Sequence, residues 1–170
     1  MSILDILKQY SATGAPPDRD VSGHFDQVAQ QSNQTQLGSG IAAALRSDST
    51  PSFGQTIGGL FGQSNPEQKA GVLNEIIQAL GPAGVAGAGG GILSRILGSG
   101  NVTSAPLTPS QAAQVSPSDM TAIATSAQQH DDSVVDRLGA FYAQHPTLVK
   151  TLGVAALGAV MSHMNQLQRA

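Results

Sequence analysis

The sequence predicts an all-α protein: a multi-helix bundle of short helices with glycine-rich connections and essentially no β-sheet. Apolar residues recur at three- and four-residue steps in most segments between the glycine and proline clusters. Several of these segments open with a capping residue followed by proline, which is a common start signal of helices. No segment shows sustained apolar–polar alternation rich in β-branched residues, so strands are not expected.

The N-terminal segment 2–10 has an amphipathic pattern that predicts a short helix. Residues 11–20 carry Gly14, Pro16 and Pro17 among polar residues and indicate a flexible linker. The first helix is therefore expected to be a separate arm, and the sequence leaves open whether residues 1–20 dock or stay mobile. From Val21 a new helix is expected, with Asp20 as its N-cap. A further helix is expected at about 36–46.

Segment 51–63 is expected to form a helix with Thr50 as N-cap and Pro51 at the first helical position. Its glycines Gly54, Gly58 and Gly62 recur every four residues, which leaves one helix face without side chains. Each interior glycine costs about 0.5–1 kcal/mol relative to alanine. Close approach of another helix, within the chain or from a second copy, would compensate for that cost. The three glycines are therefore candidate packing or interface positions.

The clearest helix start is Asn65–Pro66–Glu67–Gln68, which combines a cap, a proline and an acidic first turn. This helix is expected to end at Gly81, a suitable left-handed residue, with Pro82 beyond it. Residues 82–91 are rich in glycine and alanine and fit either a loop or a weak helix. One or two apolar turns follow at 92–97 before a linker-like segment, 98–106.

The C-terminal part repeats the cap–proline signal twice, at 108–111 and 116–119, and this predicts two short helices. Another helix is expected to start at Asp132 or Ser133 and to break near His145, because Pro146 follows. The last helix, from Pro146 to about 168, is apolar around much of its circumference, as expected in a bundle centre or an interface. Its candidate interface residues are Leu152, Leu157, Val160 and Met164.

These breaks suggest three parts: an N-terminal helix with its linker (1–20), a helical N-terminal half (21–100) and a helical C-terminal half (101–170). The length is also compatible with one compact domain.

The layout resembles the YidB-like group of small bacterial proteins of unknown function. The similar parts are the opening helix 2–10, the helix and glycine-rich passage 67–100, and the segment from 116–119 through Ala127 to 141–153. The resemblance implies an all-helical bacterial protein of the cytosol, and it implies no catalytic residues.

Charge and composition exclude several classes of function. Charged residues form 11% of the chain, against roughly 25% in typical domains. The net charge is −3 and the eight Lys and Arg residues are dispersed, so there is no basic stripe for nucleic acid. Cysteine is absent, which excludes disulfides and thiol chemistry.

The most apolar stretch, 152–161, is shorter than the roughly 20 residues of a transmembrane helix. Because the N-terminus has no signal-peptide pattern, we expect a cytoplasmic protein.

Four places in the sequence invite a chemical role, and for each a structural role is the simpler explanation. The run 84–92 resembles a phosphate-binding loop, but no strand precedes it and no Gly-Lys-Ser/Thr follows. Metal ligation by the 130–132 cluster or by His24 with Asp26 is disfavoured, because sequence neighbours converge poorly on one ion. His145 stands where a helix must break. We predict no catalytic residues, no cofactor and no metal.

Two hypotheses of function follow from the sequence. The leading one is a non-enzymatic structural or interaction protein that forms homo-oligomers, or binds another protein, through close helix–helix packing. The alternative is a helical binding module for an apolar ligand, a lipid surface or a partner helix. Neither includes nucleic acid or a transmembrane span, whereas peripheral membrane contact is compatible with the second.

Overall fold

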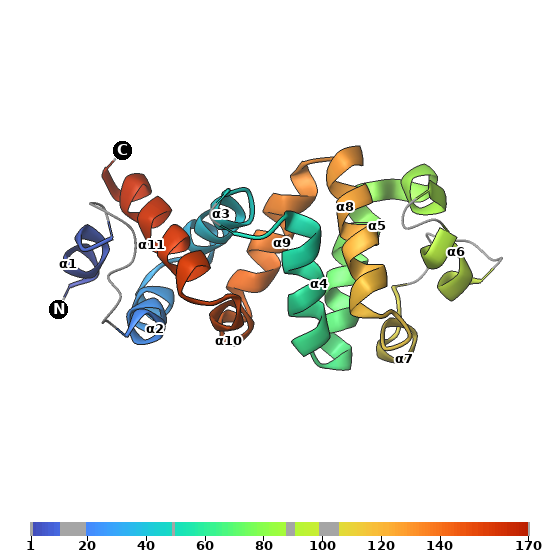
Figure 1. Cartoon of the computed structure of the whole chain (residues 1–170), viewed down its shortest axis with the longest axis horizontal. Coiled ribbons are helices and arrows are strands. Elements are labelled where there is room, and N and C mark those ends of the chain that lie inside the picture. Colours follow the sequence, from blue (N-terminus) through green and yellow to red (C-terminus); the bar gives the residue numbers. More distant parts are fainter. Residues whose placement is uncertain (1, 11–19, 49, 88–90, 99–105, 170) are drawn as a thin grey trace. The chain divides into compact units, whose positions relative to one another are not determined.

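A computed structural model of the chain describes residues 2–10, 20–48, 50–87, 91–98 and 106–169. Within these ranges the protein is all-α and has no strand, which confirms the predicted fold class (Figure 1). The helices are α1 (Ile3–Lys8), α2 (Val21–Gln31), α3 (Gln34–Leu45), α4 (Phe53–Gln63), α5 (Pro66–Gly87), α6 (Ile92–Leu97), α7 (Pro109–Ala112), α8 (Pro117–His130), α9 (Ser133–Ala143), α10 (Pro146–Val149), the 3-10 turn η2 (Lys150–Leu152) and α11 (Val154–Arg169).

The chain divides into two compact units. Unit 1 contains residues 1–51 and 139–170, and unit 2 contains residues 52–138. These boundaries do not coincide with the breaks at 20 and 100 that composition suggests. The polypeptide enters unit 2 just before α4 and leaves it inside α9, between Leu138 and Gly139. Most of the expected linker 11–20 and of the expected linker 98–106 lies outside the described residues.

Unit 1 is built around α11, which packs against α3, α2 and α1. Its core includes the fully buried side chains of Phe25 and Ile41, together with Met161 of α11. The helix α1 docks on α2 and α11 through Ile6 and Leu7, which are also fully buried. The expected N-terminal helix is therefore part of this unit.

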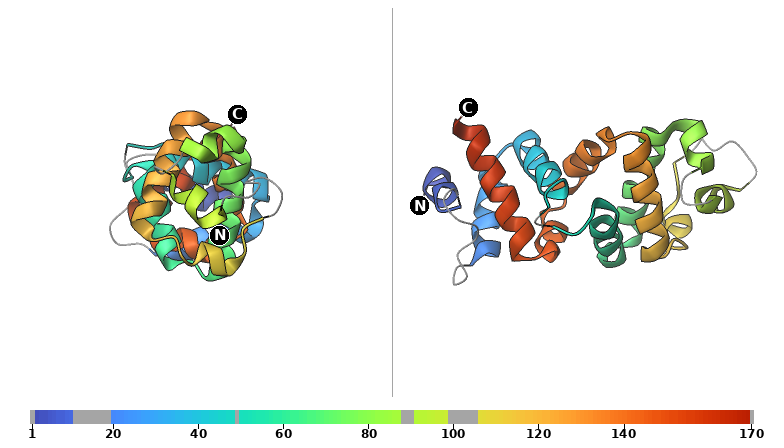
Figure 2. Two further views of the ribbon diagram at one scale, coloured as in Figure 1. Left: turned by 90° about the vertical axis from the view of Figure 1, so that its right-hand side faces the viewer. Right: turned by 45° about the horizontal axis from the view of Figure 1, so that its top comes forward.

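Unit 2 is formed by α4 to α8 and the first turns of α9. The helix α4 packs along α8, and the two lie side by side in Figure 1 and in the right-hand view of Figure 2. The helix α5 packs against α7 and α8. Ile57 and Phe61 of α4, Leu73 and Ile76 of α5, and Ile123 of α8 form its buried core.

Local capping chemistry explains several helix starts. The Asp20 side chain accepts a hydrogen bond from Gly23 N, as predicted for the N-cap of α2. Asn65 Oδ1 accepts from Gln68 N at 2.8 Å, while Gln68 Oε1 accepts from Asn65 N at 3.0 Å, which closes a reciprocal box at the start of α5. Equivalent boxes join Thr108 to Gln111 and Ser116 to Asp119 at the starts of α7 and α8. These starts are confirmed.

The predicted start of the fourth helix at Thr50–Pro51 is wrong. The helix α4 begins at Phe53, with Ser52 in the N-cap position. The Thr50 hydroxyl donates instead to the carbonyl oxygens of Ala44 and Ser47, at 2.8 and 2.9 Å. Thr50 therefore closes the C-terminus of α3 and is not available to cap α4.

Two helix ends also differ from expectation. At Gly81 the backbone takes the predicted positive φ (65°), but the chain resumes a helical path after Pro82 and α5 continues to Gly87 as a kinked helix. The predicted continuous helix 146–168 is wrong. Gly153, with φ of 89°, separates α10 and η2 from α11, and this conformation is readily adopted only by glycine.

Candidate functional site

The glycine stripe of α4 lies against α8 of the same chain. A Cβ atom built on Gly58 would lie 2.8 Å from the Pro117 carbonyl oxygen and would overlap the Thr121 hydroxyl. A Cβ atom on Gly54 would lie 2.8 Å from the Thr121 carbonyl oxygen and would overlap the Thr125 hydroxyl. Both distances are too short for a real side chain, so the two helices approach this closely only because these positions are glycine.

We call the contact of Gly54 and Gly58 with Pro117, Thr121 and Thr125 the α4–α8 seam. Gly62 makes a looser contact at the end of this seam. Its Cβ would lie 3.2 Å from Pro117 Cγ, and the residue is exposed. On the opposite helix Pro117, Thr121 and Thr125 have the matching four-residue spacing. Thr121 Oγ1 donates to the Pro117 carbonyl at 3.0 Å, and Thr125 Oγ1 donates to the Thr121 carbonyl at 2.8 Å. The hydroxyls are thus satisfied within α8, and they present small, compact groups to α4.

The solvent-facing side of α4 is a different surface, and sequence reasoning did not single it out. It consists of the exposed residues Gln55, Gly59 and Gln63, which we call the outer face of α4, and Gly62 lies at the border between this face and the contact with Pro117. Gly59 is next to Gly58, but it points away from α8, and no heavy atom lies within 4 Å of where its Cβ would be. The usable signal was that Gly58 and Gly59 are adjacent, because consecutive helical residues cannot share one face.

The apolar candidates on α11 lie in unit 1. Leu157, Val160 and Met164 are buried, whereas Leu152 lies in η2 and is partly exposed. Val160 and Met164 surround Gly40 of α3, whose Cβ would lie 3.2 Å from Val160 Cγ1 and 2.8 Å from Met164 Cγ. Val160 and Met164 therefore belong to the contact between α11 and α3, and Leu157 is a buried residue of the same unit. The stripe on α4 belongs to the other unit.

A second close backbone contact occurs in unit 1, where α3 meets the end of α9. A Cβ on Gly139 would lie 2.6 Å from the Gly38 carbonyl oxygen and 3.0 Å from Ala42 Cβ. A Cβ on Gly38 would lie 3.1 Å from the Ala140 Cα. Glycines at facing positions allow the two backbones to touch, so close packing through small residues is used in both units.

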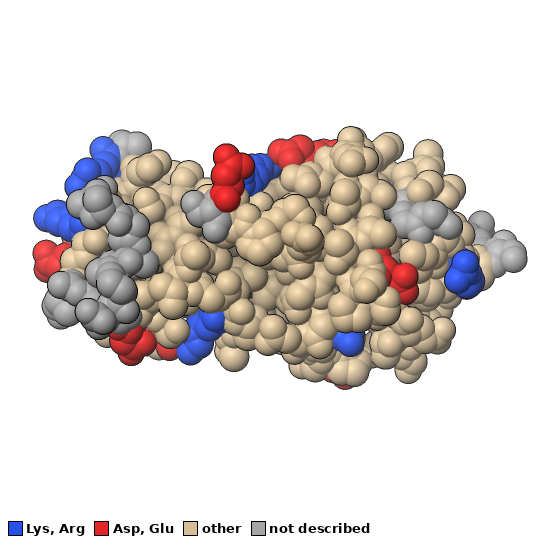
Figure 3. Space-filling view, viewed as in Figure 1, with Lys and Arg blue, Asp and Glu red and all other residues tan. Residues whose placement is uncertain are grey.

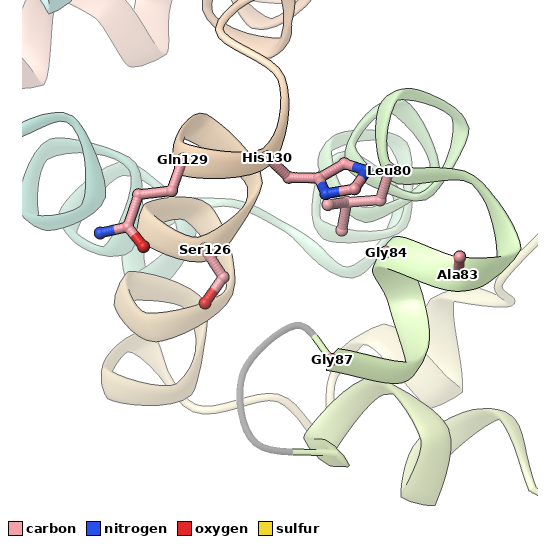
Figure 4. Close-up of a pocket in the computed structure, with 7 residues that line it drawn as sticks. All are labelled: Leu80, Ala83, Gly84, Gly87, Ser126, Gln129 and His130. Atoms are coloured by element: carbon pink, nitrogen blue, oxygen red, sulfur yellow. The ribbon is translucent and has the colours of Figure 1, made fainter.

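Unit 2 also contains a pocket of about 360 Å³ between the second half of α5 and the last turns of α8 (Figure 4). The kink at Gly81 redirects α5 and forms one wall, and the imidazole of His130 extends from the end of α8 beside Leu80. The lining residues are Leu80, Ala83, Gly84, Gly87, Ser126, Gln129 and His130. None of them is Lys, Arg, Asp or Glu. The polar groups of the lining are the Ser126 hydroxyl, the Gln129 amide and the His130 imidazole, and the other lining residues are apolar or glycine.

The other histidines considered as ligands have partners or packing roles. His24 Nδ1 and the Tyr10 hydroxyl form a hydrogen bond of 2.9 Å, which connects α2 to the end of the N-terminal helix. Asp26 pairs with Lys150 at 2.9 Å. His145 precedes α10, and its ring packs against Phe141 with centroids 4.8 Å apart. Across the described ranges, no group of three or more His, Asp or Glu residues could hold a metal ion.

Among the described residues, the pKa values of Tyr142 and Asp131 are shifted. Burial raises the pKa of the Tyr142 phenol, which is fully buried; its hydroxyl has no hydrogen-bond partner among the residues described. The pKa of Asp131 is lowered, chiefly because its carboxylate accepts a hydrogen bond from the Ser133 backbone N–H at 2.9 Å. Asp131 thereby supports the first turn of α9.

No single described helix is long and apolar enough to cross a bilayer. Residues 146–152 and α11 reach that length and hydropathy only when taken together, and the two parts are bent by 118° at Gly153.

No family model, curated protein or solved structure matches the chain. The resemblance to the YidB-like group stays a prediction.

Proposed function

We propose that this protein is a non-enzymatic interaction protein that self-associates through the outer face of α4. The observation that carries the proposal is the environment of Gly59. An interior helical glycine costs about 0.5–1 kcal/mol relative to alanine. At Gly54 and Gly58 the close approach of α8 offsets that cost, whereas Gly59 has open space and no such compensation within the described chain. Close approach of a helix from a second copy would supply it.

The chemistry of the surrounding surface supports the same proposal. The helix α4 contains no charged residue, and its exposed neighbours on α8 include Thr125. Figure 3 shows an uncharged surface over α4 and along much of α8. The centres of protein–protein interfaces are depleted of charged residues, because buried charges must be desolvated. A second α4 can therefore approach this face without stripping water from a charge.

Cysteine trapping tests the proposal cleanly, because the chain has no cysteine of its own. Gln55→Cys places one thiol on the outer face of α4, and Gln78→Cys places a matched thiol on an exposed position of α5. On mild oxidation, Gln55→Cys is expected to give covalent dimers at protein concentrations where Gln78→Cys stays monomeric. Equal dimer yields at the two positions, or no dimer at either, would contradict association through this face.

The pocket beside the α5 kink favours a second candidate function, the binding of a small apolar ligand. Its mixture of apolar surface and a few polar groups is typical of ligand pockets. Its volume lies at the small end of the usual range, roughly 300–1,000 Å³.

Anilinonaphthalene sulfonate, an apolar fluorescent probe, tests this second function. Ala83→Phe would fill the pocket, whereas Ala86→Phe adds the same group at an exposed position that does not line it. Ligand binding predicts probe fluorescence with the wild type and with Ala86→Phe, and loss with Ala83→Phe. Equal fluorescence from all three proteins would reject the pocket as the binding site.

A further inference from the structure

No further inference is drawn: the strongest candidate, the pocket between the second half of α5 and the last turns of α8 in unit 2, belongs to the site already described, and nothing in the structure shows which ligand would occupy it.

Discussion

Alanine substitutions at the neighbouring glycines Gly58 and Gly59 should change the stability of unit 2 in opposite directions. Both positions are inside α4, so each substitution gains the same helix propensity, about 0.5–1 kcal/mol. At Gly59 the added methyl group would contact no atom of another helix, so the full gain in helix propensity should appear as a higher free energy of unfolding. At Gly58 the methyl group would lie 2.8 Å from the Pro117 carbonyl oxygen and overlap the Thr121 hydroxyl.

The difference in the free energy of unfolding between the two variants gives the steric cost of adding a methyl group between α4 and α8. Overpacking a tight contact typically costs about 1–3 kcal/mol. The Pro117 oxygen belongs to the backbone of α8 and cannot rotate away, so α4 and α8 must separate. Because the propensity gains cancel, Gly58→Ala should be less stable than Gly59→Ala by about 1–3 kcal/mol.

Urea denaturation followed by circular dichroism measures this difference, at a protein concentration low enough that self-association does not contribute. The expected order of midpoints is Gly59→Ala, then wild type, then Gly58→Ala. Thr121→Ala removes one of the two clashing groups, so the double variant with Gly58→Ala should lose less stability than the sum of the single variants. If Gly58→Ala matched Gly59→Ala, the close seam between α4 and α8 would be refuted.

The remaining predictions concern Gly139 and Tyr142 of unit 1. Gly139→Ala should destabilise the protein by about 1–3 kcal/mol in the same denaturation assay, because the new Cβ would lie 2.6 Å from the Gly38 carbonyl oxygen. A urea midpoint equal to that of the wild type would contradict the contact between α3 and α9. Tyr142→Phe should stabilise it by about 1 kcal/mol, because it removes a buried hydroxyl that has no partner in the described chain. Burial raises the pKa of Tyr142 in the folded state, so the unfolded state, with its ordinary value of 10.0, loses the proton first. The wild type should therefore lose stability as the pH rises above about 10, and Tyr142→Phe should lose less. Tyr10→Phe is the control for the stabilisation, because it removes a buried hydroxyl that is bonded to His24 and should therefore not stabilise the protein. An alkaline loss unchanged by Tyr142→Phe would contradict the assignment.

The sequence predicted the features that depend on a few adjacent residues. The starts of α2, α5, α7 and α8 follow from short capping patterns, because the cap side chain bonds a backbone N–H only three residues away. The break before Pro146 is equally local, since proline restricts the residue that precedes it.

Features that depend on tertiary packing could not be predicted. Apolar periodicity continues across Gly153, so the pattern alone gives no sign of the positive φ that separates η2 from α11. Thr50 looks like a cap for the following helix, but its hydroxyl bonds to the end of the preceding one. The division at 51 and 138 depends on contacts between helices far apart in sequence, whereas composition marks only glycine- and proline-rich connections.

The candidate site could be predicted only in part, because it also depends on tertiary packing. The four-residue spacing of Gly54, Gly58 and Gly62 predicts that a helix packs closely on that face, but it does not identify which helix. The partner positions on α8, Thr121 and Thr125, have the same spacing, and this signal becomes informative only once the two helices are known to be adjacent. The exposed Gly59 requires the structure, because its open surroundings distinguish it from Gly58.

The most direct test of self-association through α4 is the absolute solution mass, measured by light scattering after size-exclusion chromatography over a concentration series. The wild type should move from 17.2 kDa toward a multiple of that mass as concentration rises. Gly59→Lys, which places a charge on the outer face of α4, should stay at 17.2 kDa, whereas Gln78→Lys, the same charge on α5, should behave as the wild type. A wild type that stays at 17.2 kDa throughout, or a Gly59→Lys variant that associates as the wild type does, would contradict the proposal.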